Sequence, residues 1–385
     1  MTAAVLNEIE AASHLDIDAL LGDPDIRVVV CCGSGGVGKT TTAAALALRA
    51  AEEHGRRTVV LTIDPARRLA QSLGLSDLDN TPRQVTGIKA GGSGELHAMM
   101  LDMKRTFDEV VAAHTDQRRA EEIFVNPFYQ AMSSTFAGTQ EYMAMEKLSQ
   151  LRARDDWDLI VVDTPPSRSA LDFLDAPARL GRFLDGRMLR LLLAPARAGG
   201  RSVFSLVTAS FGLFSKLMDK ILGAQLITDL SGFVGALDSM FGGFRERSEQ
   251  TFRVLQAPET AFLIVAAPEP DAVREADYFA GRLESERMPL AGLILNRVHA
   301  VTAAGIGAVE AADAGEAIRA ENPAAADVLM IHAELAARSE RERIVARRFT
   351  AAHAGVPVAA IAAQPVDVHD IDGLRAIGEA LALGR

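Results

Sequence analysis

A glycine-rich segment between an apolar run and a helical pattern constrains this chain more than any other feature. The segment consists of Gly33, Ser34, Gly35, Gly36, Val37, Gly38, Lys39 and Thr40. Apolar residues fill 28–32 before it, and an alanine-rich helical pattern covers 41–48 after it. A loop of this composition, placed between a strand and a helix, directs successive backbone N–H groups toward phosphate oxygens. The sequence therefore predicts a P-loop that binds a nucleoside triphosphate.

Three polar residues at the end of this segment have expected roles toward the nucleotide. Lys39 is predicted to reach the β- and γ-phosphates, which makes it a candidate catalytic residue as well as a binding residue. The Thr40 hydroxyl is predicted to bind Mg²⁺, and Thr41 belongs to the same binding segment at the start of the helix. The expected cofactors are therefore ATP and Mg²⁺.

A dinucleotide-binding loop is the competing interpretation of the same residues. Gly33, Gly35 and Gly38 also fit the pattern G-x-G-x-x-G, and Asp64 ends the next apolar run, where such a fold needs an acid. A dinucleotide site has no use for a Lys-Thr pair at the helix start, and Pro65 follows Asp64 directly. The P-loop interpretation is therefore favoured.

The order of apolar runs predicts the fold class. Short runs rich in Val, Ile and Leu alternate with helix-sized segments, which indicates an α/β fold with a doubly wound, mostly parallel sheet of the P-loop NTPase type. The expected strands are 26–32, 58–63, 95–101, 159–163, 262–267, 290–296 and 358–361. Two segments, about 104–150 and 178–255, have helical patterns throughout and predict an inserted helical subdomain. We expect residues 1–25 to form an N-terminal extension and residues 26–385 the P-loop ATPase domain.

Two aspartates at the ends of expected strands are candidate site residues. Asp163 ends the run Leu159–Val162, and an aspartate in this position after a P-loop usually holds the Mg²⁺ shell. Asp64 ends another run and is a candidate catalytic residue, because a carboxylate near the γ-phosphate can orient or deprotonate the attacking water. Each also has a structural alternative: Asp163 as the cap of a turn, and Asp64 as a helix N-cap before Pro65.

Composition and charge limit the partners and the compartment. The chain has 385 residues and a formal net charge of −11, which argues against a nucleic-acid surface. The first 25 residues lack a secretory pattern. The chain contains no run of 18 apolar residues, so we expect no stable membrane insertion. Two adjacent cysteines, Cys31 and Cys32, suit a reducing compartment and are interpreted as small core residues. We therefore expect a cytoplasmic protein.

These motifs together resemble the anion-transporting ATPases, which include the arsenite-pump ATPase and the targeting ATPases for tail-anchored membrane proteins, within the wider MinD/ParA group. The residues that carry the resemblance are 33–42, 64–66, 138–141, 163–166 with 171–174, 268–269, 296–297 and 356–358. The resemblance implies a dimer that sandwiches nucleotide, with Asp64 positioning water, Asp163 in the second switch and Asn296 contacting adenine. Without the resemblance, Asn296 is equally well interpreted as a turn former after a strand.

The chain departs from the family at Ser34. The family's loop usually carries a lysine just after the first glycine, and this lysine reaches the partner's phosphates. Its absence here implies slow hydrolysis alone, compensation by Arg67 or Arg68, or a heterodimer with a lysine-bearing paralogue. The other possible assembly is a homodimer of this chain.

The resemblance also implies a client. Targeting members hold a transmembrane helix in a methionine-rich groove, and this chain has eight methionines in or next to its expected helical region: Met99, Met100, Met103, Met132, Met143, Met145, Met218 and Met240. The alternative is that these methionines fill an ordinary core. The favoured hypothesis is an ATPase whose opening and closing captures and releases a hydrophobic membrane-protein client, and the alternative is a regulatory or positioning switch of the MinD/ParA kind.

Overall fold

The computed structural model describes residues 14–64, 68–89, 91–126, 129–130, 139–165, 249–301, 303 and 305–383. The chain divides into two compact units, each treated by itself below. Unit 1 comprises Met1–Leu101, Leu151–Leu171 and Val254–Arg385, and unit 2 comprises Asp102–Gln150 and Asp172–Arg253. Most of the second segment of the expected helical subdomain, residues 178–248, lies outside the described residues.

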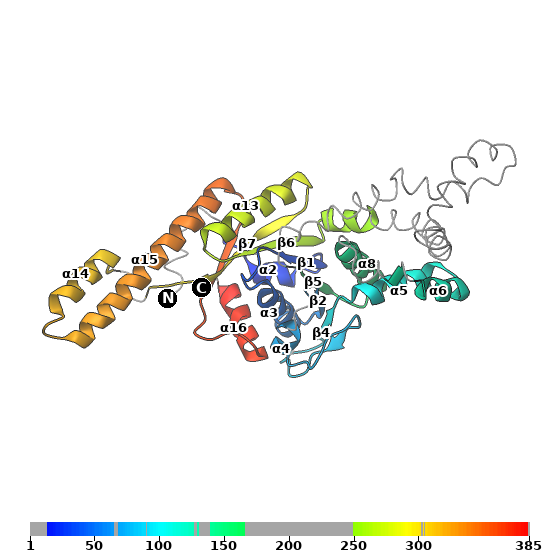
Figure 1. Ribbon diagram of the computed structural model, residues 1–385, viewed down its shortest axis with the longest axis horizontal. Coiled ribbons are helices and arrows are strands. Elements are labelled where there is room, and N and C mark those ends of the chain that lie inside the picture. Colours follow the sequence, from blue (N-terminus) through cyan, green and yellow to red (C-terminus); the bar gives the residue numbers. More distant parts are fainter. Residues whose placement is uncertain are drawn as a thin grey trace, which may run out of the picture. The chain divides into compact units, whose positions relative to one another are not determined.

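Unit 1 is built on one eight-stranded sheet (Figure 1). The strands are β1 (Val28–Cys32), β2 (Arg57–Thr62), β3 (Arg83–Gln84), β4 (Glu95–Met100), β5 (Leu159–Asp163), β6 (Thr260–Ala266), β7 (Leu290–Val298) and β8 (Val358–Ala362). Their order in the sheet is β3-β4-β2-β5-β1-β6-β7-β8, and only β3 runs antiparallel to its neighbour. The predicted doubly wound, mostly parallel α/β fold is therefore confirmed.

All seven expected strands are present, with ends that differ by at most a few residues. β3 was not predicted from the sequence, because its two residues are both exposed and carry no apolar pattern. By contrast, every residue of β1, β5 and β6 is buried. Strands covered on both faces have continuous apolar runs, and this pattern predicted these strands from the sequence.

The order of the strands places a switch point beside β1. From β1 the chain continues to β2 on one side of the sheet, whereas from β6 it continues to β7 and β8 on the other side. β1 itself pairs with β5 on one side and β6 on the other. In open sheets of this kind, ligands bind beyond the carboxyl ends of the strands at the switch point. The segment 33–38, which follows β1, lies at that point.

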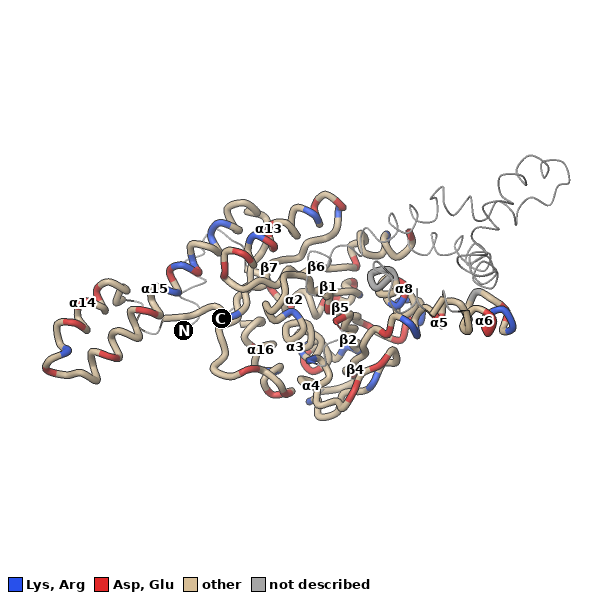
Figure 2. The backbone as a smooth tube through the Cα atoms, viewed as in Figure 1, with Lys and Arg blue, Asp and Glu red and all other residues tan. Residues whose placement is uncertain are grey.

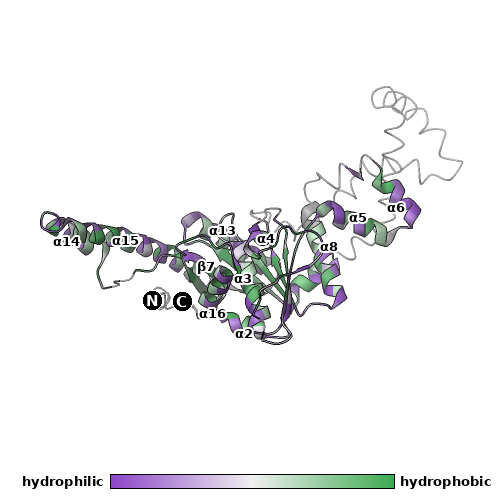
Figure 3. Ribbon diagram, turned by 90° about the horizontal axis from the view of Figure 1, so that it is seen from below, coloured by the Kyte–Doolittle hydropathy of each residue, from purple (hydrophilic) through white to green (hydrophobic). Residues whose placement is uncertain are grey.

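Helices cover the sheet and close the core of unit 1. They are α2 (Ile17–Gly22), α3 (Lys39–Glu52), α4 (Arg68–Ser72), α13 (Pro270–Ser285), α14 (Ala308–Ile318), α15 (Pro323–Ala352) and α16 (Ile371–Leu383). α3 packs on β2, β5 and α16, while α13 packs on β6 and β7. The strands at the centre of the sheet are mostly hydrophobic (Figure 3). Leu15, Ile17 and Leu21 are buried in the same cluster as α3, so residues 14–22 of the expected N-terminal extension are part of this core.

The described part of unit 2 is helical. It contains α5 (Met103–His114), α6 (Gln117–Phe124) and most of α8 (Thr139–Arg154). Tyr129 is fully buried, and its hydroxyl donates to Asp108 at 2.5 Å. Met143 and Met145 are buried, as is Met99 in β4 of unit 1. These three methionines fill cores and are not part of an exposed groove, while Met132, Met218 and Met240 lie outside the described residues.

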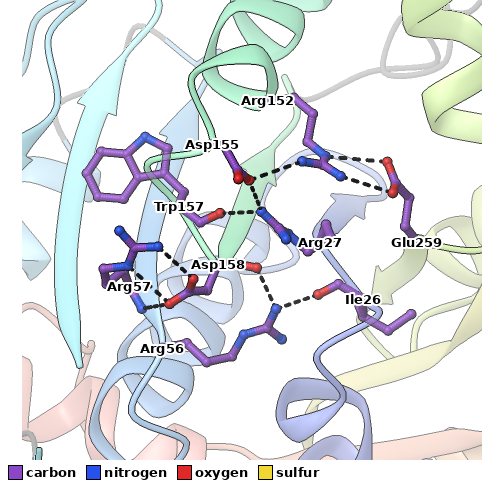
Figure 4. A network of polar contacts seen from close by, with 9 residues as sticks. All are labelled: Ile26, Arg27, Arg56, Arg57, Arg152, Asp155, Trp157, Asp158 and Glu259. Carbon is purple, nitrogen blue, oxygen red and sulfur yellow. Dashed lines mark hydrogen bonds and ion pairs between the residues drawn. The ribbon is translucent and has the colours of Figure 1, made fainter. Parts of the chain in front are cut away.

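A polar network ties the amino ends of β1, β2 and β5 together (Figure 4). The guanidinium of Arg56 is buried and donates to four backbone oxygens, those of Leu21, Asp23, Ile26 and Asp158. Burial lowers the pKa of Arg56, with the nearby Asp158 carboxylate acting in the opposite direction. Arg57 pairs with the same Asp158 at 3.0 Å but is half exposed. Arg56 therefore satisfies backbone oxygens at this end of the core.

We predict that Arg56→Met destabilises the fold by about 3 kcal/mol or more, because it leaves buried carbonyl oxygens without a donor. Arg57→Met, which removes the neighbouring and more exposed guanidinium, is the matched control and should cost much less. Urea unfolding monitored by circular dichroism measures both losses. Equal destabilisation by the two substitutions would contradict this assignment.

Candidate nucleotide-binding site

The loop 33–38 has a backbone that only glycine fits at two positions. Gly33 has φ of 151° and Gly38 has φ of 94°. A Cβ atom at Gly33 would lie 2.0 Å from the backbone oxygen of Val265 in β6, and one at Gly38 would lie 2.2 Å from Nδ2 of Asn296. Any larger residue at either position would clash, so the glycines let the loop turn between β1 and α3.

Lys39 is the first residue of α3 and is only 6% exposed. Its ammonium group donates to the backbone oxygen of Ser34 at 2.6 Å, so the side chain folds back across the loop. Burial lowers the pKa of Lys39, while the negative charge of Asp163 raises it. The lysine therefore presents a positive charge within the loop at the N-terminal end of α3, where the helix dipole also favours anions.

Asp163 lies at the end of β5, between the ends of β1 and β2. The strand register sets Thr62 and Cys31 beside it. One oxygen of its carboxylate, Oδ2, accepts from the hydroxyl of Thr40 at 2.8 Å and from the hydroxyl of Thr62 at 2.8 Å. The carboxylate thus connects the P-loop helix to two strands of the sheet.

The second oxygen of this carboxylate has no donor. Asp163 is fully buried, and its Oδ1 atom has no hydrogen-bond partner among the residues that the structure describes. Burial raises the pKa of Asp163 to about 6, although the hydroxyls of Thr40 and Thr62 and the charge of Lys39 all lower it. A buried carboxylate with an unpaired oxygen beside a threonine hydroxyl is a donor set that suits Mg²⁺. The residues present therefore fit the expected ion.

Asp64 lies two residues beyond β2 and is partly exposed. Its backbone N–H donates to the hydroxyl of Thr62 at 3.2 Å. Its negative charge acts on both Lys39 and Asp163, so all three groups are within electrostatic range of one another. Pro65, Ala66 and Arg67, which complete this motif, lie outside the described residues, and Arg68 is exposed at the start of α4.

Asn296 contacts the P-loop directly. The expected strand ended at Asn296, whereas β7 continues to Val298, so Asn296 lies within the strand near a register shift. Its side-chain amide donates to the backbone oxygen of Val37 at 2.7 Å, and its Oδ1 atom accepts from the backbone N–H of Arg297. Arg297 has a left-handed backbone with φ of 63°. In this arrangement Asn296 links β7 to the loop.

The remaining site candidates occupy the same loop. Gly35 and Gly36 are exposed, Thr41 is partly exposed, and Ser34 and Val37 are buried. Thr62 was not predicted as a site residue, because a threonine near a strand end is ordinary strand composition. Only the pairing of β2 with β5, which sets Thr62 beside Asp163, gives it a role.

Comparisons with known proteins identify the family. The sequence profile described as Anion-transporting ATPase matches residues 26–312. The chain belongs to this family, because the match covers most of its length and includes the P-loop.

Several curated proteins are similar to the chain. It is 26% identical to ATPase GET3 of Malassezia globosa over 181 residues, which are 47% of this chain and 51% of that protein. It is 26% identical to the ATPase ASNA1 homolog of Cryptosporidium parvum over 69% of this chain and 63% of that protein. It is 23% identical to ATPase get3 of Sclerotinia sclerotiorum over 77% of this chain and 80% of that protein. The chain spans about half the length of the first of these relatives.

We predict that the Asp163 carboxyl makes the stability of the nucleotide-free and magnesium-free protein pH-dependent. Its folded-state pKa of about 6 lies above the ordinary value of 3.8, so the folded state binds the extra proton between these values. The free energy of unfolding, compared with that of Asp163→Asn, should therefore increase as pH falls from 7.5 to 5. Urea unfolding of both proteins across this range tests the sign, and a free energy of unfolding of the natural protein that falls or stays constant relative to Asp163→Asn toward acid would contradict it.

Proposed function

We propose that this chain is a cytoplasmic, Mg²⁺-dependent ATP hydrolase. The observation that supports the proposal best is the Asp163 carboxylate, which accepts from Thr40 of the P-loop helix and has a second, unpaired oxygen beside it. Membership of the anion-transporting ATPase family agrees with this chemistry. Among the described residues, every helix is too short or too polar to cross a bilayer.

In the proposed mechanism, each residue acts on a different part of the triphosphate. The backbone N–H groups of 33–38 and the ammonium group of Lys39 hold the phosphate oxygens and stabilise the charge that develops on them. Thr40 and Asp163 would hold Mg²⁺, which supplies further charge stabilisation when bound. Asp64 orients the attacking water and accepts its proton. Asn296 donates to the loop from β7, and the family resemblance implies that it also contacts adenine.

The position of Ser34 suggests that a second chain completes the site. Ser34 is buried, and its backbone oxygen already accepts from Lys39. A serine has no charge to reach a neighbouring phosphate, so a homodimer lacks the lysine that the family usually places here. We propose a dimer across the nucleotide face, with a lysine-bearing paralogue as the preferred partner.

We further propose that the nucleotide cycle captures and releases a hydrophobic client, a transmembrane segment of a membrane protein. The support is the resemblance to targeting ATPases and the apolar helical pattern of residues 214–244 in the sequence. Among the described methionines, Met99, Met143 and Met145 are buried and Met100 and Met103 are half-buried, so they add no support for an exposed groove.

We predict that Lys39→Ala and Asp64→Asn each reduce steady-state ATP turnover by about a hundredfold or more, because each removes a group that acts in the transition state. Lys104→Ala is the control, since it removes an exposed lysine that pairs with Asp108 on the same helix. Phosphate release measures turnover. A loss of less than tenfold for both site variants would refute the assigned roles.

The same turnover assay tests the Ser34 hypothesis with a paralogue mixture and with substitutions of Ser34. Mixing the chain with a lysine-bearing paralogue, or replacing Ser34 with lysine, should raise turnover, whereas Ser34→Ala should not. No gain from the paralogue, together with no complex between the two chains, would remove the heteromeric assembly.

Client capture is predicted to depend on nucleotide. A fluorescent transmembrane peptide should bind the chain in one nucleotide state and be released in the other, as measured by fluorescence anisotropy with and without ATP. A peptide of the same length with aspartates in its centre is the control. Equal binding in both states, or none, would exclude this part of the proposal and leave a regulatory switch as the alternative.

A further inference from the structure

The helices α14 and α15 form a closely packed hairpin. A Cβ atom at Gly315 of α14 would lie 3.2 Å from the backbone oxygen of Ala326 in α15, so the two backbones approach closely. Ala311, Ala326 and Ala333 are buried at the contact. His332 also contacts the backbone oxygen of Ile306 at 3.0 Å. Small residues thus let α14 cover one face of α15 and leave its opposite face for other contacts.

That opposite face carries residues spaced seven apart: Val328, Leu335, Glu342 and Phe349. Near the end of α15, Glu342 and Phe349 are buried, where the helix packs on α13 and β7. Glu342 accepts from the backbone N–H of His299 and from the guanidinium of Arg338, and it contacts the His299 ring. In the second half of α15 this face of the helix is therefore buried.

In the first half of α15 the same face is exposed. Val328 and Ile331 are each 66% exposed, and Leu335 is half-buried. Their spacing of three and four residues places them side by side on the helix surface. Large aliphatic side chains that continue a buried face into solvent indicate a surface that another helix covers.

The charges of the hairpin separate along its length (Figure 2). The half made of α14 and the start of α15 carries Glu310, Asp313, Glu316, Glu321, Asp327 and Glu334, with Arg319 as its base. The remaining half of α15 carries Arg338, Arg341, Arg343, Arg347 and Arg348, with Glu340 and Glu342 as its acids. On α15 itself, the acids Asp327 and Glu334 precede the arginines, so the helix is complementary in charge to a copy that runs in the opposite direction.

We propose that the exposed face of α15 binds the same face of a second copy of this chain, in an antiparallel pair with two-fold symmetry. An axis between Ile331 and Leu335 buries Val328, Ile331 and Leu335 of both copies. It also sets Asp327 near the partner's Arg338 and the partner's Arg341. A two-fold contact uses the same patch on both chains, which is what the self-complementary charge pattern provides.

The charge pattern favours this occupant over others. Asp327 and Glu334 flank the aliphatic residues, and Asp327 also pairs with Arg319 at 3.3 Å on the surface. An apolar transmembrane segment or an anionic lipid surface would offer these carboxylates no positive charge. The contact covers about three helical turns, at the lower end of specific interface sizes, so we expect a dissociation constant of about 10 μM. The pairing is separate from the nucleotide face and requires no ATP.

Sedimentation velocity of the full chain without nucleotide tests the proposal from about 1 to about 100 μM protein. The natural chain should shift from monomer to dimer, and Val328→Asp with Ile331→Asp should weaken the association at least tenfold. Both positions are exposed, so the double variant should keep its circular dichroism spectrum and its ATP turnover. Val309→Asp is the matched control: Val309 is 75% exposed, but it lies on α14 and should leave association unchanged.

Charge reversal identifies the orientation. Asp327→Arg alone and Arg341→Glu alone should each weaken self-association, whereas an equimolar mixture of the two variants should restore it, because both contacts of the mixed dimer then pair opposite charges. A natural chain that stays monomeric, a dimer unaffected by the double aspartate variant, or a mixture that fails to associate would each overturn the proposal. None of these outcomes depends on whether ATP is hydrolysed.

Discussion

The hydrogen bonds to the Asp163 carboxylate are the interaction on which the candidate site depends. One buried oxygen accepts from Thr40 on α3 and from Thr62 on β2, while the residue itself ends β5. Three elements that are distant in sequence therefore meet at one atom. Burial makes the charged form costly, which raises the pKa to about 6, and this cost is acceptable where a cation or a phosphate-bound ion compensates it. The polar cluster is thus suited to binding rather than to stability.

At the amino ends of the same strands, polar groups have a different role. There Arg56 donates to the backbone oxygens of Leu21, Asp23, Ile26 and Asp158, and that of Asp23 also accepts from the backbone N–H of Ile26 at 3.2 Å. All of its contacts are within the chain, whereas Asp163 retains an unpaired oxygen. Between the two clusters lie the continuous apolar residues of β1 and β5. At the amino ends of these strands the polar contacts are made within the chain, whereas at the carboxyl ends one carboxylate oxygen has no partner among the described residues. The carboxyl ends are where a ligand is expected.

β7 connects the candidate site with the hairpin. Asn296 on this strand donates to the P-loop, and His299, three residues further, contacts Glu342 of α15. The backbone between them includes the left-handed Arg297 at a register shift. The proposed self-association surface and the proposed nucleotide site thus share a structural support, although the two proposals depend on different residues and different measurements.

The sequence by itself determined the P-loop, the seven main strands and the parallel fold class, because these depend on local patterns: glycine spacing, continuous apolar runs and strand-terminal aspartates. It could not determine the role of Thr62, which exists only through the pairing of β2 with β5. It also placed Asn296 at the end of a strand, whereas in the tertiary structure β7 continues to Val298 and Asn296 donates to Val37. The exposed strand β3 and the burial of Arg56 could not be predicted from the sequence either. Contacts between residues far apart in the chain decide these features, and no local pattern records which strands become neighbours.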